Sequence, residues 1–185
     1  MTSPTGYSPP AKWLHWLTAF AVLGMIPLGL YMVRRGAITN FDELTNTLYT
    51  THKTVGFLVF WLVGMRIVYR VRAGAPAPAA TLTPLERIAS GAVHHLLYVL
   101  LPVVPLLGWA GVSAYGARET LGGFSLPPLL PNNPPLGETI LAIHGYAALL
   151  MAALILAHIG GALMHGVIKQ DGVLNRMIGW WPLKR

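Results

Sequence analysis

The chain has 185 residues, is 54% hydrophobic and is only 10% charged, which is typical of a small integral membrane protein rather than a soluble domain. It has no cysteine, so disulfides, iron–sulfur clusters, cysteine-ligated zinc and covalently attached c-type haem are excluded. The net charge of +7 raises nucleic acid as a partner, but the position of the charges along the chain explains the excess by membrane topology instead.

Four apolar runs predict four transmembrane helices, because about 20 apolar residues suffice to cross a bilayer. They cover residues 11–33, 48–69, 88–112 and 139–168. Trp13 and Trp16 stand at the entry of the first span, where interfacial anchors are usual. Pro102 and Pro105 are expected to kink the third span. The fourth span contains no Asp, Glu, Lys or Arg.

The segments between and after the spans are short. Residues 71–84 form a connector rich in Ala and Pro, and residues 117–137 form the longest loop, whose leucines favour a place in the membrane interface. Residues 173–185 mix apolar and basic side chains and predict an amphipathic anchor on the membrane surface. We therefore expect residues 1–185 to form one all-α domain, an integral membrane four-helix bundle.

The charges are divided unequally between the two sides of this bundle. Nine Lys and Arg residues against two acids fall on the side of the termini, and four against four fall on the other side. The positive-inside rule then places both termini in the cytoplasm. We predict a multi-pass protein of the bacterial inner membrane, with the lipid bilayer as its partner and no role for nucleic acid.

Histidines are the unusual feature of the spans. His144, His158 and His165 follow one another on nearly the same face of the fourth span, since a helix turns about 100° per residue. Imidazoles inside a membrane span are costly and point to function. The order of the spans puts His52 and His144 at an outer level, and lets His15 and His158 share an inner level about 21 Å away.

Two imidazole pairs at two depths are what two six-coordinate b-type haems require, one pair for each iron. We predict His52 and His144 as ligands of the outer haem iron, and His15 and His158 as ligands of the inner one. Filled axial positions suit electron transfer rather than oxygen binding. The alternatives are interhelical hydrogen bonds, metal transport or a proton relay.

Other residues are assigned binding roles, and no side chain is assigned a catalytic one. Arg66 shares the face of His52 and is a candidate partner of the inner haem propionates, although a snorkelling arginine fits its spacing equally well. His165 and His94 are candidates for hydrogen bonds to a quinone, whereas His95 is expected at the interface. Gly145, Gly160 and Gly161 flank the ligand positions and would make room for a macrocycle or for close helix packing.

Several motifs resemble the prokaryotic four-helix cytochrome b561 family, and within it the small single-subunit superoxide oxidases. The matching stretches are LHW at 14–16, His52 followed by VGF at 55–57, MRIVYR at 65–70, HHLLY at 94–98, FSLPPLLP at 124–131, HGYAALL at 144–150, AHIGGALMH at 157–165 and KQDGVLNRM at 169–177. The resemblance covers the chain from about residue 11 onward. It implies the same two histidine pairs, and a quinone near His165.

The expected cofactors are thus two haem b, with ubiquinone as acceptor. The leading hypothesis is a superoxide:ubiquinone oxidoreductase, in which Arg34, Arg35, Lys53 and Arg118 steer the superoxide anion and are offset by the acids of the same side. The alternative is a haem-b subunit that anchors a periplasmic dehydrogenase, hydrogenase or cytochrome and passes its electrons to quinone. A third hypothesis is a haem-free transporter lined by histidine.

Overall fold

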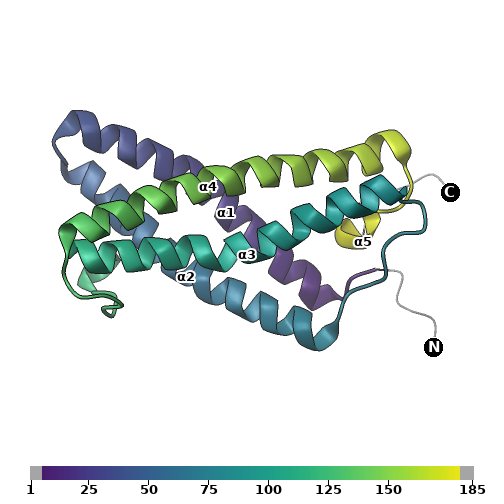
Figure 1. Cartoon of the computed structure of the whole chain (residues 1–185), viewed down its shortest axis with the longest axis horizontal. Helices are drawn as coiled ribbons and strands as arrows, with labels where there is room; N and C mark the ends of the chain where they lie inside the picture. Colours follow the sequence, from purple (N-terminus) through teal and green to yellow (C-terminus); the bar gives the residue numbers. More distant parts are fainter. Residues whose placement is uncertain (1–5, 180–185) are drawn as a thin grey trace.

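The computed structural model describes residues 6–179, and within them the chain is almost entirely helical (Figure 1). The elements are α1 (Pro9–Thr39), α2 (Glu43–Ala73), α3 (Pro84–Tyr115), η1 (Leu121–Gly123), α4 (Pro134–Leu163), the π-helical turn η2 (Met164–Lys169) and α5 (Asn175–Ile178). The last six residues of the predicted amphipathic tail lie outside the described part of the chain.

Four helices are long and apolar enough to cross a membrane, counting η2 as the continuation of α4. Their outward faces carry large apolar side chains that are exposed, as lipid-facing side chains are. Examples are Trp13 and Phe20 on α1, Trp61 on α2 and Leu156 on α4. The predicted all-α membrane four-helix bundle is confirmed.

The helices extend several residues beyond the predicted spans because polar caps prolong them. The Asp42 side chain accepts a hydrogen bond from the backbone N–H of Thr45 and so begins α2. Thr83 and Glu86 form a capping box at the start of α3. Pro102 and Pro105, expected to kink the third span, both lie inside the one continuous helix α3.

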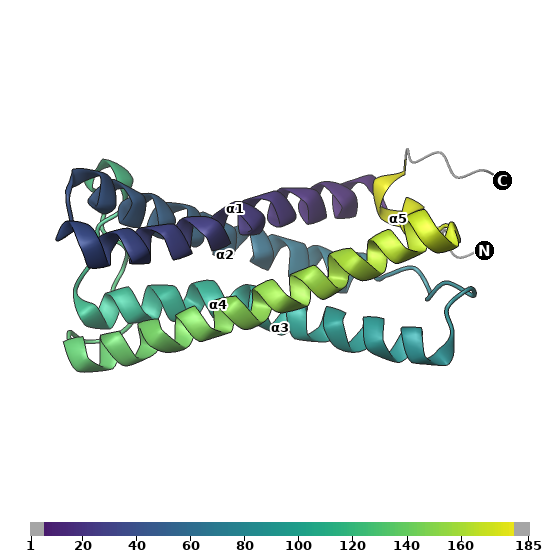
Figure 2. The same cartoon turned by 90° about the horizontal axis from the view of Figure 1, so that it is seen from above.

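The bundle is built from two hairpins, α1 with α2 and α3 with α4, which lie on opposite sides of the molecule (Figure 2). The first and last described residues meet at one end, where the backbone N–H of Tyr7 donates to the carbonyl of Arg176. We call this end the termini end. The opposite end, which holds residues 117–133, is the loop end.

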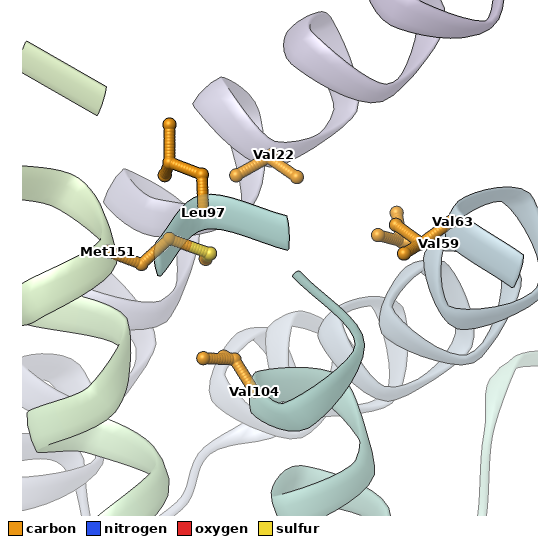
Figure 3. Packing of buried hydrophobic residues seen from close by; sticks show 6 residues of the cluster. All are labelled: Val22, Val59, Val63, Leu97, Val104 and Met151. Atoms are coloured by element: carbon orange, nitrogen blue, oxygen red, sulfur yellow. The ribbon is translucent and has the colours of Figure 1, made fainter. Parts of the chain in front are cut away.

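The core lies at mid-length, where side chains from all four long helices meet (Figure 3). Its buried members are Val22, Val59, Val63, Leu97, Val104 and Met151. Three of these core residues, Val22, Val59 and Met151, each follow a histidine by seven residues on the same helix. The series are His15, Val22 and Gly29 on α1, His52, Val59 and Arg66 on α2, and His144, Met151, His158 and His165 on α4. Seven residues are close to two helical turns, so each series faces the bundle interior.

The loop end is closed by hydrogen bonds from the long loop back to α3. The hydroxyl of Ser113 accepts from the backbone N–H groups of Leu129 and Leu130, and the indole of Trp109 donates to the carbonyl of Pro127. The backbone N–H of Leu121 donates to the hydroxyl of Thr54 on α2. The loop therefore joins the two hairpins at this end.

Candidate functional site

At the loop end, His52 of α2 faces His144 of α4. The two ring centres are 6.2 Å apart and the ring planes are inclined at 88°. His144 donates from Nδ1 to the carbonyl of Val104 at 2.8 Å, which leaves the lone pair of Nε2 available. Nδ1 of His52 is buried and has no hydrogen-bond partner among residues 6–179. Both imidazoles are thus able to bind a further group.

A glycine stands behind each of these two rings. A Cβ atom built on Gly29 of α1 would lie 3.1 Å from Cε1 of His52, and one built on Gly108 of α3 would lie 3.1 Å from Cε1 of His144. A larger residue would therefore crowd the ring, which would have to shift by a few tenths of an ångström for the Cβ atom alone. The absence of a side chain at Gly108 also lets His144 reach the backbone of α3 one turn away, at Val104.

At the termini end, His15 of α1 faces His158 of α4. Their ring centres are 6.1 Å apart, with planes inclined at 66°. Arg66 donates from Nη2 to Nδ1 of His15 at 2.9 Å, and its guanidinium carbon lies 5.5 Å from the ring centre of Tyr98. His94 of α3 lies nearer to His158, at 5.0 Å, and donates from Nδ1 to the carbonyl of Ser90.

The ring separations test whether a metal porphyrin fits between these couples. Two metal–imidazole bonds of about 2.0–2.1 Å, with about 1.1 Å from each nitrogen to its ring centre, place the ring centres about 6.3 Å apart. The couples His52–His144 and His15–His158 match this separation. The His94–His158 separation of 5.0 Å is too short. The residues present therefore fit a bis-histidine haem at each end, and they favour His15 over His94 as the partner of His158.

The remaining candidates lie toward the termini end. His165 is buried, and its Nδ1 is 2.6 Å from Oδ2 of Asp171. It lies in the π-helical turn η2, a local geometry that is frequent at functional sites. His95 is exposed and donates to the carbonyl of Gly91, as expected for an interfacial histidine.

Sequence reasoning missed three residues of the site: Gly29, Gly108 and Asp171. A signal existed for the two glycines, since Gly29 follows His15 and Gly108 follows His94 by fourteen residues on the same helix face. The glycines singled out instead are Gly145, Gly160 and Gly161. A Cβ atom added at any of these three would meet no atom of a neighbouring element within 4 Å. Close helix packing therefore does not explain them.

The chain matches the family described as prokaryotic cytochrome b561 over residues 6–180. It is 30% identical to cytochrome b561 homolog 2 of Escherichia coli, covering 96% of this chain and 93% of that protein. It is also 30% identical to cytochrome b562 of Cereibacter sphaeroides, covering 96% and 98% of the two chains. Its identity to a probable superoxide oxidase CybB of Yersinia pestis is 26%, covering 93% of each. With its four membrane helices and its opposed histidines, the chain belongs to the prokaryotic cytochrome b561 family, whose members are membrane b-type cytochromes that transfer electrons.

Proposed function

We propose that this protein carries electrons across the bacterial inner membrane from superoxide, on the periplasmic side, to ubiquinone near the cytoplasmic side. In this proposal it holds two haem b and has both termini in the cytoplasm. The observation that carries the proposal is the presence of two opposed imidazole couples at the two ends of one bundle, each with the ring separation of a bis-histidine haem.

His52 and His144 would hold one haem, and His15 and His158 the other. A bis-histidine haem b exchanges single electrons and leaves no iron position for oxygen. The side chains between the two levels, Val22, Val59 and Met151, are buried and apolar. They keep water out of the space that separates the two couples.

The hydrogen bond between Arg66 and His15 bears on the role of both residues. A guanidinium only donates, so Nδ1 of His15 must accept from it and cannot carry a proton. When His15 ligates iron through Nε2, its Nδ1 carries the proton, and Arg66 must turn to another acceptor. Haem propionates are carboxylates, the acceptors that a guanidinium prefers, and this supports Arg66 as their partner.

The distribution of charge supports a cytoplasmic termini end. The basic residues there, among residues 6–179, are Lys12, Arg66, Arg70, Arg72, Arg87, Lys169 and Arg176. In membrane proteins, the side of the bilayer whose short loops carry an excess of Lys and Arg is the cytoplasmic side. The loop end, with His52 and His144, then faces the periplasm and an external electron donor.

A polar pocket at the loop end supports an anionic donor such as superoxide. The pocket has a volume of about 690 Å³, and its charged lining consists of Lys53, Arg118 and Glu119. The three charges sum to one net positive charge. Lys53 directly follows His52 in the chain, so this cation lies close to the proposed outer haem. One relative carries superoxide oxidase in its name, which agrees with this donor.

At the termini end, His165 and His94 support a quinone as the acceptor. A quinone carbonyl accepts hydrogen bonds, and both histidines use Nδ1 for a neighbour within the protein. Their Nε2 atoms carry a hydrogen to donate to a quinone when the imidazole is protonated, a state that the carboxylate of Asp171 stabilises for His165. His165 lies one heptad beyond His158 toward the termini end, and its side chain is buried.

The decisive experiment is a pulse of superoxide on purified protein, with haem reduction followed optically in stopped flow. We expect two haems per chain and haem reduction within milliseconds, followed by reoxidation when a short-chain ubiquinone is added. A preparation without haem would refute the proposal. If two haems are present but superoxide does not reduce them, superoxide is not the electron donor, and the proposal that the protein carries electrons still stands.

A second function is favoured by the surface of the loop end. Leu121, Phe124 and Leu129 are large apolar side chains that are exposed on the loop segment, and such side chains suit a protein contact. In this case the chain is the membrane subunit of a periplasmic dehydrogenase, hydrogenase or cytochrome. Haems that superoxide does not reduce, but that a co-expressed periplasmic partner does reduce, would establish this alternative.

A further inference from the structure

The buried side chain of His165 has one hydrogen-bonding partner in the described part of the chain. Its side chain is buried, and the only hydrogen bond found for it among residues 6–179 joins Nδ1 to Oδ2 of Asp171 at 2.6 Å. The other carboxylate oxygen of Asp171 accepts from the backbone N–H of Val173. The Asp171 side chain is itself only 10% exposed, so the pair forms a fixed unit.

Asp171 also lines a pocket at the termini end. This pocket has a volume of about 480 Å³ and brings together Lys12 of α1, Thr81 of the α2–α3 connector and Arg176 of α5. Asp171 thus has one side on a space that opens to the surface and the other side on a buried histidine. Among residues 6–179, it is the one pocket residue with a hydrogen bond to the side chain of His165.

We propose that the protons consumed in quinone reduction enter from this pocket and reach the quinone through the His165–Asp171 pair, with His165 as the proton donor and Asp171 as its positioning residue. The inference rests on the proposed function, because it assumes a quinone at His165. It adds the source of the protons and assigns a role to Asp171.

Quinone reduction consumes protons as well as electrons. Conversion of a quinone to a quinol takes two electrons, which the proposed electron transfer supplies, and two protons. For each proton, the N–H bond at Nε2 of His165 breaks and an O–H bond forms on the quinone. His165 then regains a proton at Nε2 as a hydronium ion that enters from the pocket becomes water, and Asp171 supplies the counter-charge while the imidazole is charged.

The charged groups around the pair are few. Lys12 and Arg176 face the pocket, and Lys169, two residues before Asp171, is paired with Glu86 of α3. Burial raises the pKa of Asp171, but hydrogen bonds from His165 and from the backbone of Val173 outweigh it, so this pKa lies below its ordinary value. The carboxylate is therefore charged at neutral pH and able to hold a protonated imidazole.

The test is the variant Asp171→Asn, which keeps the acceptor for the N–H of Val173 and removes the charge. We expect normal haem content, normal haem reduction by superoxide or dithionite, and reoxidation by a short-chain ubiquinone slowed at least about tenfold at pH 7. The solvent deuterium isotope effect on this step should rise, because proton transfer becomes limiting. Asp171→Glu should recover most of the rate, and Asp42→Asn at the loop end is the matched control.

A second variant, Lys12→Gln, tests the pocket without changing the pair. Removing this cation should shift the fall in quinone reduction rate toward higher pH, since protonation at the pocket becomes easier. Unchanged rates, isotope effects and pH profiles in both variants would overturn the inference. A wild-type protein that reduces no quinone would instead overturn the proposed function, so the two failures are distinguishable.

Discussion

His144 on α4 donates a hydrogen bond from Nδ1 to the backbone carbonyl of Val104 on α3, at 2.8 Å. The bond fixes the tautomer of the imidazole and leaves the lone pair of Nε2 free, in a ring whose centre lies 6.2 Å from that of His52. It depends on Gly108, which lies one turn further along α3 and leaves room for the ring. One glycine, one carbonyl and one histidine thus hold the donor atom of a proposed iron ligand in place.

Gly108→Val should remove the haem of the loop end. The Cβ atom alone would lie 3.1 Å from Cε1 of His144, and the added methyl groups leave the ring no room to keep its place. We expect the haem content to fall from two per chain to about one, measured as the pyridine haemochrome. Gly64→Val is the control, since nothing lies within 4 Å of a Cβ at this position. Two haems in Gly108→Val would contradict the proposed cradle.

Arg66→Met should lower the midpoint potential of the haem at the termini end. Reduction adds an electron, and a cation nearby stabilises the reduced state, so its removal makes reduction harder. We expect a shift of tens of millivolts in one of two potentials in a redox titration, and a smaller shift in Arg66→Lys, which keeps the charge. Arg72→Met, at the exposed end of α2, is the control. Identical potentials in all variants would show that Arg66 does not act on the haem.

Much of this architecture was accessible from the sequence, because it depends on periodicity. The fourteen-residue spacing from His144 to His158 predicts two ligand levels, and the apolar runs predict the bundle that brings opposite helices together. The helix ends were less predictable, since caps such as Asp42 prolong the helices beyond the apolar runs. Spacing places Gly29 and Gly108 on the histidine faces of their helices, but it does not say which ring of a neighbouring helix each one meets. The His165–Asp171 contact escaped because it depends on how a turn folds back, which residue spacing does not carry.

The turn between α1 and α2 should confer a specific sensitivity to acid. The pKa of Asp42 is lowered to about 2, first because the hydroxyl and the backbone N–H of Thr45 donate to it, and then because Arg35 pairs with it at 2.5 Å. The folded pKa lies below the ordinary value of about 3.9, so this carboxylate stabilises the fold above about pH 4, and its contribution is lost as the pH falls toward 2.

The expected measurement is thermal unfolding in detergent at pH 6 and at pH 3, followed by circular dichroism. Asp42→Ala should melt at a lower temperature than the wild type at pH 6, and the difference should shrink at pH 3. Asp42→Asn keeps an N-cap without a titrating group, so its melting temperature at pH 6 should fall less than that of Asp42→Ala. An equal difference between wild type and Asp42→Ala at both pH values would refute this account of the cap.

The pocket at the loop end should make the reaction with superoxide sensitive to salt. Lys53 lines it beside the proposed outer haem and donates to the carbonyl of Ala117, and Arg118 donates to the carbonyl of Leu126, so both cations are held in place. Fixed positive charge at a binding site raises the association rate of an anion, and at 0.1 M salt this attraction is largely screened beyond about 10 Å. Lys53→Gln should therefore slow haem reduction by superoxide and flatten its dependence on ionic strength, while reduction by a neutral donor stays the same.

Glu119→Gln should have the opposite effect, because it removes the acid that offsets the two cations in the same pocket. If both variants react with superoxide at the wild-type rate at low salt, the pocket does not guide the anion, and the donor is then to be sought among proteins that dock on the exposed loop.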